Sequence, residues 1–356
     1  MPYPRFPQEP EPDFERLRTV LARGTPDRVP FIELSIDFPV LAAIREDPFS
    51  TNPPDLHRQY VEVYRRLGYD YCPVWAGVSF SRKYLPTADD TAGLPHDQRS
   101  WLDETHGTIE TWADFEQYPW PTPKAVDYTH LEQIAASLPD GMKIMFAYSG
   151  VLEHLLWLMS YQGLSYAMAD QPDLVDAMVR RIGELLLNVF KTAASHESVG
   201  ALWLGDDMAF KTQTLVSPDV LRRHVFPWQR RLAETAHAVG KPFLLHSCGN
   251  IGAVMEELIE EVGIDALHSF EDVIEPVTEA KRRWGDRIAL LGGVDMDVLA
   301  RGSVDLVRRR TREVLEVCMP GGGYALGSGN SVANYIPLEN YFAMLEEGWR
   351  VGSYAA

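Results

Sequence analysis

The amino-acid sequence predicts an α/β protein folded as a (β/α)8 barrel, the TIM-barrel architecture. Eight short apolar segments recur along its 356 residues, and helical segments separate most of them. Strands that alternate with helices build a parallel sheet, and eight such units suffice to close a barrel. The alternative is an open, doubly wound sheet, but no glycine-rich dinucleotide fingerprint follows the first apolar segment.

The predicted elements follow one another in a regular order. Residues 1–13, rich in proline and acidic residues, predict an extended arm, and residues 14–23 predict a helix. The eight predicted strands cover residues 28–34, 69–75, 143–148, 201–206, 242–248, 266–271, 288–295 and 323–328. Between the later strands, apolar side chains recur at helical spacing over residues 218–239, 254–262 and 304–317.

One connection, residues 78–142, is too long to be a simple link between a strand and a helix. Within it, residues 101–112 predict a β-hairpin, and the proline-rich residues 118–123 predict rigid coil. We expect this insertion to form a lid over the mouth of the barrel. The whole chain, residues 1–356, is therefore expected to fold as a single domain.

Composition and charge exclude several classes of function. The formal net charge of −18 argues against a general nucleic-acid binder and against a protein held on anionic lipid. No apolar run is long enough to cross a bilayer, and the first residues do not predict a secretion signal. The three widely spaced cysteines do not form a disulfide framework, so we expect a cytoplasmic protein.

The most specific local motif is His-Ser-Cys-Gly-Asn at residues 246–250, at the end of the fifth predicted strand. Side chains alternate along a strand, so His246 and Cys248 point the same way. Imidazole nitrogen and thiolate sulfur are ligands that zinc prefers. Taken alone, however, a histidine and a cysteine of this kind are more often buried core residues than metal ligands.

Further polar and aromatic side chains fall at the carboxyl ends of the predicted strands, where barrels of this class carry their active sites. They are Glu33, Trp75, Tyr148, Asp206, Asp207, His246, Cys248, Glu271, Ser328 and Asn330. An acid after a strand often only caps the next helix. That explanation is weaker for Asp206 and Asp207, because two adjacent carboxylates need a cation, a proton or a hydrogen-bond network to offset their repulsion.

Several short segments of the chain resemble the uroporphyrinogen decarboxylase superfamily. The matching segments are Gly-Asp-Asp-Met at 205–208, His-Ser-Cys-Gly-Asn at 246–250 and Pro-Leu-Glu-Asn at 337–340, with support from residues 103–108, 118–121, 285–288 and 292–295. Within the superfamily, the chain looks more like the branch of zinc- and cobalamin-linked methyltransferases. The resemblance covers nearly the whole chain from Phe14 onward, and it implies the same barrel fold.

In that methyltransferase branch, zinc sits on a His-x-Cys pair, which an acid from the next strand and a cysteine after the last strand can complete. Here His246 and Cys248 match the pair, and Glu271 matches the acid. Asn330 stands where the last cysteine is expected. The resemblance therefore implies zinc on these three residues, with Asn330 or water in the fourth place. The missing thiolate should weaken zinc binding, whereas an open fourth place is what a catalytic zinc needs.

The chain departs from true uroporphyrinogen decarboxylase at several positions. That enzyme carries an arginine-rich motif after the first strand, where this chain has Glu33 and Asp37. Trp75 stands in place of the expected aspartate after the second strand, and Ser328 in place of the expected histidine after the eighth. Tyr148 matches the active-site tyrosine of the family. A highly anionic porphyrinogen would meet acids where arginines are needed, so this substrate is not expected.

The first functional hypothesis is zinc-assisted methyl transfer. A corrinoid, carried by a corrinoid protein, would be the methyl donor or acceptor, and a thiol or another small molecule would be its counterpart. Asp206 or Asp207 would orient the substrate or take a proton, and Tyr148 is a further candidate catalytic residue. Contacts to the small-molecule substrate are expected from Glu33, Trp75, Ser328 and Asn330. Homodimers are common in the family, so a homodimer is a further expectation.

Two other hypotheses stay open. The first is a metal-free decarboxylase or other lyase that acts on a small aromatic or tetrapyrrole-like acid, with Asp206 or Asp207 stabilising positive charge on a ring. The second is a non-catalytic corrinoid or tetrapyrrole binder. The lyase activity would survive chelation of metal ions. The binder would shift the visible absorption bands of cobalamin without turnover.

Overall fold

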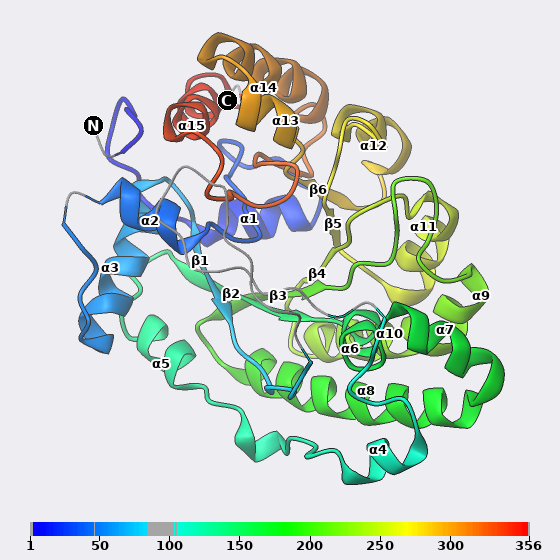
Figure 1. Cartoon of the computed structure of the whole chain (residues 1–356). Helices are drawn as coiled ribbons and strands as arrows, with labels where there is room; N and C mark the ends of the chain where they lie inside the picture. Colours follow the sequence, from blue (N-terminus) through cyan, green and yellow to red (C-terminus); the bar gives the residue numbers. More distant parts are fainter. Residues whose placement is uncertain (1–2, 46, 84–102, 104, 355–356) are drawn as a thin grey trace.

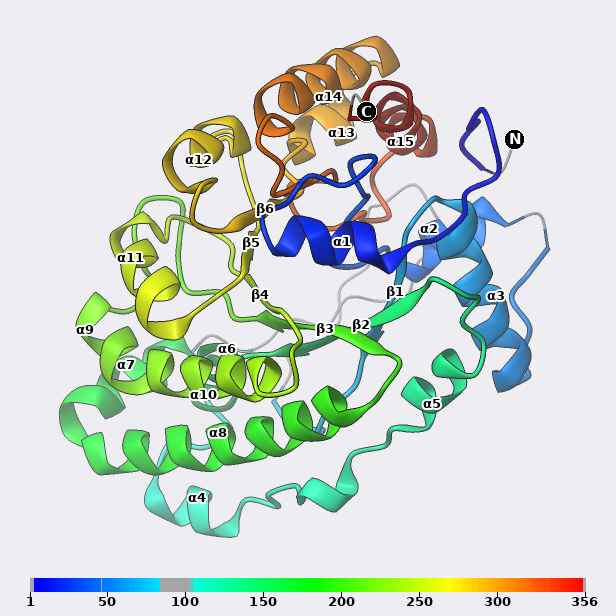
Figure 2. The same ribbon diagram turned by 180° about the vertical axis from the view of Figure 1, so that it is seen from behind.

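Within the part of the chain that the structure describes, seven parallel strands curl into a barrel of the (β/α)8 class, and the helices lie outside it (Figures 1 and 2). The computed structural model describes residues 3–45, 47–83, 103 and 105–354. The strands are β1 Tyr71–Trp75, β2 Lys143–Ser149, β3 Val199–Gly205, β4 Phe243–His246, β5 Ala266–His268, β6 Ala289–Leu291 and β7 Tyr324–Ala325. Each strand pairs with the next one along the chain, so the predicted fold class is confirmed.

The first of the eight predicted strands is present only as isolated bridges. Phe31 bridges Leu326 in parallel, beside the last strand. The amide of Ile32 donates to the Leu326 carbonyl at 2.8 Å, and the Leu326 amide donates to the Pro30 carbonyl at 2.9 Å. Pro30 has no N–H group, so it cannot take part as a donor in a regular ladder. Residues 28–34 therefore occupy the eighth position without forming a strand as long as predicted.

Glu33 connects this eighth position to both of its neighbours. The Tyr71 hydroxyl on β1 accepts the Glu33 amide hydrogen at 2.7 Å and donates to the Glu33 carbonyl. The Glu33 carboxyl group accepts the amide of Ser328 at 2.7 Å and its hydroxyl at 2.5 Å. Glu33 is fully buried. Side-chain hydrogen bonds thus close the barrel where the backbone ladder is incomplete.

The helices surround the sheet, and most of them follow the strands in sequence. They are α1 Phe14–Leu21, α2 Phe38–Ile44, α3 Pro53–Arg66, α4 Trp112–Gln117, α5 Thr129–Ala135, α6 Val151–Met159, α7 Tyr161–Asp170, α8 Pro172–Ser195, α9 Pro218–Val220, α10 Phe226–His237, α11 Met255–Glu257, α12 Val277–Trp284, α13 Met296–Arg301, α14 Val304–Cys318 and α15 Leu338–Val351. The helix predicted over 218–239 is interrupted by a π-helical turn at Leu221–Val225. No helix in the described ranges is long and apolar enough to span a membrane.

The β-hairpin predicted over residues 101–112 is wrong in the part that the structure describes. Trp112 begins α4, and Thr111 caps that helix in a reciprocal capping box with Asp114. Residues 101, 102 and 104 lie outside the described residues. The β-propensity of the aromatic and threonine residues in this stretch is outweighed by this local capping chemistry.

The later part of the insertion lies on the outside of the barrel. Helix α5 packs against α3, β1 and β2, and the short 3-10 helix Pro123–Ala125 contacts α8 (Figure 1). Helix α5 therefore covers the outer face of the first two strands, as the helix after β1 would in a regular barrel. Residues 84–102 lie outside the described residues, so the lid over the barrel mouth stays a prediction.

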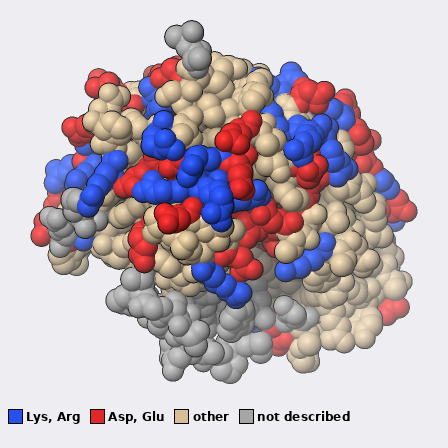
Figure 3. Space-filling view, turned by 90° about the horizontal axis from the view of Figure 1, so that it is seen from above, with Lys and Arg blue, Asp and Glu red and all other residues tan. Residues whose placement is uncertain are grey.

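The charges on the face that carries the last helices are mixed in sign. Figure 3 shows Lys and Arg side chains beside Asp and Glu side chains across this face. Arg310 on α14 pairs with Asp272 at 2.6 Å, and Arg308 on the same helix pairs with Glu346 on α15. Opposite charges therefore offset each other locally on this face of a strongly acidic chain.

Burial raises the pKa of Glu33 to about 8, although the two hydrogen bonds from Ser328 oppose this shift. The folded state therefore favours the protonated carboxyl group. Its stabilising contribution is fully present below the ordinary pKa of about 4.5 and is lost as the pH rises toward 8. In Glu33→Gln, the side chain can keep both contacts to Ser328 without a titrating group. We expect the wild-type free energy of unfolding to fall between pH 5 and pH 8 by roughly 3 kcal/mol more than that of the variant.

Urea unfolding at a series of pH values measures this difference. Parallel pH profiles for the wild type and Glu33→Gln would show that Glu33 does not carry a proton in the folded barrel.

Candidate metal centre and active site

Three side chains with metal-binding atoms meet at the carboxyl ends of β3 and β4. The ligand atoms of Asp207, His246 and Cys248 all lie within 4.8 Å of one another. The His246 Nε2 atom is 3.4 Å from Cys248 Sγ and 3.6 Å from Asp207 Oδ1. Among the described residues, this is the one group of three or more such side chains. The predicted pair of His246 and Cys248 thus acquires a third partner from the neighbouring strand.

The register of the sheet explains why these three residues meet. Gly205 on β3 pairs with His246 on β4. Asp207 and Cys248 each lie two residues beyond this pair, so they leave the sheet at the same level. The Asp207 carboxylate accepts the backbone amide of Cys248 at 2.7 Å, which fixes one loop against the other. The spacing of the cluster is therefore set by backbone pairing.

A tight turn after Cys248 holds the thiol in place. Gly249 adopts a φ of +86°, and a Cβ atom there would lie 2.2 Å from the Ala209 carbonyl oxygen. Only glycine combines this backbone conformation with such a close approach. The amide of Asn250 then donates to the Phe210 carbonyl at 2.7 Å. The glycine of the sequence motif is thus required by the packing of the two loops that carry Asp207 and Cys248.

The electrostatics of the cluster suit a cation. Burial and the nearby Asp207 charge raise the pKa of the Cys248 thiol to about 12. Burial also lowers the pKa of His246, which keeps the imidazole neutral. A bound divalent cation would lower the pKa of the Cys248 thiol, because a thiol that coordinates a metal is deprotonated. A neutral imidazole, a thiol and a carboxylate at these distances match the ligand set that zinc takes.

Asn330 also reaches this cluster, from the loop after β7. Its Nδ2 atom donates to Cys248 Sγ at 3.1 Å, and its amide oxygen accepts the Ser331 hydroxyl at 3.3 Å. The preceding Gly329 is tightly packed, because a Cβ atom there would lie 2.3 Å from the Phe270 carbonyl oxygen. The residue at the expected cysteine position is therefore next to the thiol, as a hydrogen-bond donor to the sulfur.

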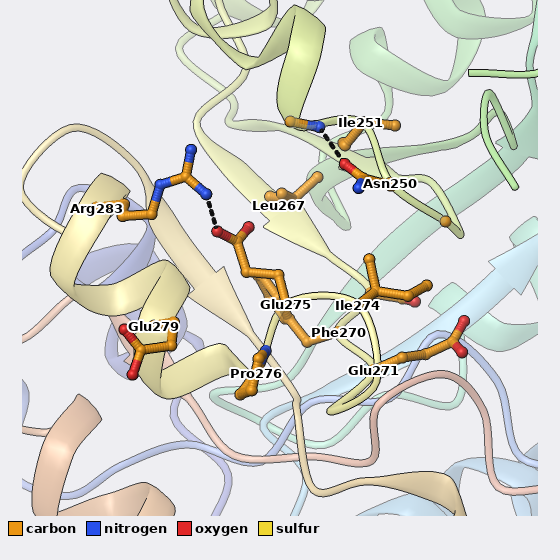
Figure 4. A pocket seen from close by; sticks show the side chains of 13 residues that line it. Asn250, Ile251, Leu267, Phe270, Glu271, Ile274, Glu275, Pro276, Glu279 and Arg283 are labelled. Atoms are coloured by element: carbon orange, nitrogen blue, oxygen red, sulfur yellow. Dashed lines mark hydrogen bonds and ion pairs between the residues drawn. The ribbon is translucent and has the colours of Figure 1, made fainter. Parts of the chain in front are cut away.

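Glu271 is not part of this group of three ligand residues. It lines a cavity of about 340 Å³ beside the cluster, together with Asn250, Phe270, Ile274 and other residues of the adjoining loops and α12. Figure 4 shows its carboxylate pointing away from the Glu275–Arg283 ion pair on the other side of this cavity. The carboxylate that the structure places beside His246 belongs to Asp207. A ligand role for Glu271 stays a prediction.

The fold places the two adjacent aspartates, Asp206 and Asp207, in different environments. Asp206 is fully buried and accepts the Glu153 amide at 3.0 Å and the Gln229 side-chain amide at 2.9 Å. It thereby caps the first turn of α6, where Gly150 leaves room for it: a Cβ atom at that glycine would lie 2.1 Å from Asp206 Cγ. Burial raises the pKa of Asp206 to about 7. Its catalytic role stays a prediction, while Asp207 is the aspartate beside the thiol and imidazole.

Glu153 is a third carboxyl group at this end of the barrel, and the sequence did not single it out as catalytic. Burial raises the pKa of Glu153, and the charges of Asp207 and Asp206 raise it further, whereas Arg82 opposes them. In the sequence, Glu153 resembles an ordinary acid in the first turn of a helix. Only its burial beside two aspartates distinguishes it.

Tyr148 is engaged in contacts within the protein, whereas Trp75 is partly exposed to solvent. The Tyr148 hydroxyl donates to the Val78 carbonyl, and its ring packs so closely on Gly77 that a Cβ atom there would lie 2.0 Å away. Trp75 is 39% exposed, and the edge of its indole lies 3.8 Å from the Cβ position of Gly205. With respect to the described residues, Trp75 thus keeps part of its aromatic surface exposed near Gly205, while Tyr148 is engaged with the backbone.

Glu33 and Ser328, both predicted to contact substrate, are bonded to each other inside the barrel. Both residues are fully buried. Their predicted contact with substrate is untested. In this structure they serve the closure of the barrel.

Comparison with known proteins places these observations in a family. Residues 106–348 match the family model described as uroporphyrinogen decarboxylase (URO-D). The chain is 31% identical over 132 residues, 37% of its length and 36% of the relative's, to the methylcobamide:CoM methyltransferase MtaA of Methanosarcina barkeri. It is 36% identical over 101 residues, 28% of each chain, to a uroporphyrinogen decarboxylase of Thioalkalivibrio sulfidiphilus. The aligned segments thus span little more than a third of these relatives or less.

A solved structure supports the same assignment at the level of the fold. A methyltransferase from Methanosarcina mazei superposes with a TM-score of 0.69 at 18% sequence identity, over 95% of this chain and 98% of that chain. The family match extends over more than half of the residues and includes the loops that carry Asp207, His246 and Cys248. The chain belongs to the uroporphyrinogen decarboxylase family.

Proposed function

We propose that this protein is a zinc-assisted methyltransferase that moves a methyl group between a corrinoid and a thiol or another small acceptor. The proposal rests on the donor set of Asp207, His246 and Cys248, whose ligand atoms lie within 4.8 Å of one another. The names of the methylcobamide-dependent relatives support the reaction class. The departures from uroporphyrinogen decarboxylase at Glu33, Trp75 and Ser328 argue against a porphyrinogen substrate.

In this proposal, the chain's residues hold the metal and shape its surroundings. His246 would bind through Nε2, Cys248 through Sγ and Asp207 through a carboxylate oxygen. Zinc, when bound, would keep an acceptor thiol as its thiolate at neutral pH. The N–H···S hydrogen bond from Asn330 would draw charge from the Cys248 sulfur, which makes that sulfur a weaker nucleophile than the acceptor.

The transfer itself balances without a further reactant. The acceptor sulfur forms a bond to the methyl carbon, the cobalt–carbon bond breaks, and its electron pair stays on cobalt. The proton of the acceptor thiol leaves to water. The exposed indole of Trp75 would give the incoming group an aromatic surface near the reacting atoms.

A metal-free lyase is the second candidate, and the state of Asp206 favours it. Asp206 is buried, outside the group of three ligand residues, and has its pKa raised to about 7. A carboxyl group of this kind can exchange a proton near neutral pH. The aligned segment of the uroporphyrinogen decarboxylase relative is in keeping with such chemistry on a small aromatic or pyrrole-like acid.

We expect about one zinc per chain in protein purified without chelator, measured by elemental mass spectrometry. Cys248→Ala should lose the metal, because it removes the sulfur ligand. Cys318→Ala is the matched control, since Cys318 is a buried thiol on α14 that lies near the Val277 carbonyl and outside the cluster. No zinc in the wild type, even after incubation with the metal, would reject the proposed metal centre.

The identity of the carboxylate ligand can be tested with Asp207→Asn and Glu271→Gln. We expect Asp207→Asn to weaken zinc binding by roughly 10- to 100-fold or more, measured by competition with a chromophoric chelator. Glu271→Gln should change the affinity by less than about threefold, because its carboxylate does not belong to the cluster. The opposite order would assign the ligand position to Glu271, as the family resemblance implies.

We expect methyl transfer from methylcobalamin to a panel of small thiols, followed by the change in the visible spectrum of the cobalamin. The activity should disappear after chelation and in Cys248→Ala, and Cys318→Ala should retain it. Turnover of a small aromatic acid that survives chelation would instead support the lyase. A visible-band shift without any turnover would indicate a corrinoid binder.

A further inference from the structure

A second buried histidine lies directly behind His246. His268 on β5 is its partner in the parallel register of β4 and β5. Their rings are 5.0 Å apart between centroids, and the two Nδ1 atoms are separated by 2.7 Å. Both side chains are buried, with 5% and 0% of their surface exposed. This short nitrogen–nitrogen contact requires that one ring donates a proton and the other accepts it.

The surroundings of the pair indicate which ring donates. On the far side of His268, a Cβ atom at Gly292 would lie 3.1 Å from its Nε2 atom and 2.2 Å from the Ser328 carbonyl oxygen. His268 Nε2 forms no hydrogen bond to the described residues, but the Ser328 carbonyl on this side favours a proton on Nε2 over a lone pair, because a carbonyl can only accept. A neutral His268 with its proton on Nε2 therefore has a free lone pair on Nδ1. That lone pair accepts the Nδ1 proton of His246.

The position of the proton on Nδ1 also determines the state of Nε2, the other ring nitrogen of His246. With its proton on Nδ1, a neutral His246 has its lone pair on Nε2, the atom 3.4 Å from Cys248 Sγ and 3.6 Å from Asp207 Oδ1. A metal ion binds only to an unprotonated ring nitrogen, so this tautomer is the one that can ligate.

Rigid packing keeps His268 in this role. The Trp203 ring meets it edge to face, with centroids 5.3 Å apart and an interplanar angle of 88°. Gly292 adopts a φ of +78° beside the other edge of the imidazole, and a Cβ atom there would lie 2.2 Å from the Ser328 carbonyl oxygen, so the position requires glycine. His268 is thus held between β3 and the β6–β7 end of the barrel, and His246 is oriented by a partner that has little freedom to turn.

We propose that His268 is a positioning residue that holds His246 in the tautomer with its proton on Nδ1 and its lone pair on Nε2. The tautomer is a property of the metal-free chain. Its consequence, a preset imidazole ligand, rests on the proposed zinc centre. Without the acceptor on His268, the His246 proton would be free to move to Nε2, where it blocks ligation.

The first test reads the tautomer in metal-free protein by nitrogen-15 NMR of histidine-labelled chains, because protonated and bare ring nitrogens have well separated shifts. The His246 signals are assigned by their loss in His246→Gln. We expect a protonated Nδ1 and a bare Nε2 in the wild type. A protonated Nε2 in the wild type would overturn the proposal, and this reading depends on no variant of His268.

A matched pair of variants provides the second test. Asn and Leu have similar size and shape, but only Asn at position 268 can place an oxygen acceptor near the former Nδ1. We expect His268→Leu to lose the single Nδ1–H tautomer and to bind zinc roughly 10- to 100-fold more weakly, while His268→Asn stays within about threefold of the wild type. Equal losses in both variants would indicate a packing role alone, and no loss in either would also reject the proposal.

The two readouts separate this inference from the proposed function. A protonated Nδ1 without any zinc binding in the wild type would uphold the role of His268 and reject the metal centre. Zinc binding in a wild type whose metal-free chain has a protonated Nε2 would support the metal centre and reject the role of His268. Thermal unfolding of both variants checks that each one is folded under the conditions of the measurement.

Discussion

The in-register pairing of β3, β4 and β5 is the constraint on which the candidate centre depends. Gly205 pairs with His246, and His246 pairs with His268. Backbone hydrogen bonds across parallel strands fix these positions, and they thereby determine which side chains lie next to one another. Asp207 and Cys248 continue from the ends of the same strands. A shift of one residue in this register would turn His246 away from the barrel interior and separate the three ligand atoms.

Around this register, the protein places its carboxyl groups in different environments. Asp207 stays partly exposed and faces His246, while Asp206 is withdrawn beneath α6. Glu153 lies close enough to both that their charges raise its pKa. Three carboxylates in so small a space would repel one another, and the raised pKa values of Asp206 and Glu153 allow protons to offset this repulsion.

Ser328 links the candidate centre to the closure of the barrel. Its amide and hydroxyl bind Glu33, and its carbonyl lies against His268. A single residue after β7 therefore touches both the eighth position of the barrel and the histidine behind His246. Because protein interiors are close-packed, a change at Glu33 is expected to reach this pair through a short chain of buried contacts. The serine that stands in place of the histidine expected for true uroporphyrinogen decarboxylase thus contributes its hydroxyl to the contact with Glu33.

The fold was largely predictable from the sequence, because the alternation of apolar strands and amphipathic helices is a local pattern. The exceptions have local causes that pattern alone does not reveal. Pro30 shortens the first predicted strand to bridges, and the Thr111–Asp114 capping box starts α4 at the last residue of the predicted hairpin. The carboxyl ends of the strands could also be predicted to gather polar residues, since every (β/α)8 barrel places its strand ends together.

By itself, the sequence determined the barrel, the direction shared by His246 and Cys248, and the position of Asn330 near the last strand. These follow from the two-residue period of a strand and from segments close together in the chain. Only the tertiary structure decided that Asp207 meets His246, that Asp206 caps α6, and that His268 lies in hydrogen-bond contact with His246. Each of these contacts joins residues on different strands or helices. Their distances depend on the register and on loop packing, which arise only when the whole sheet has formed.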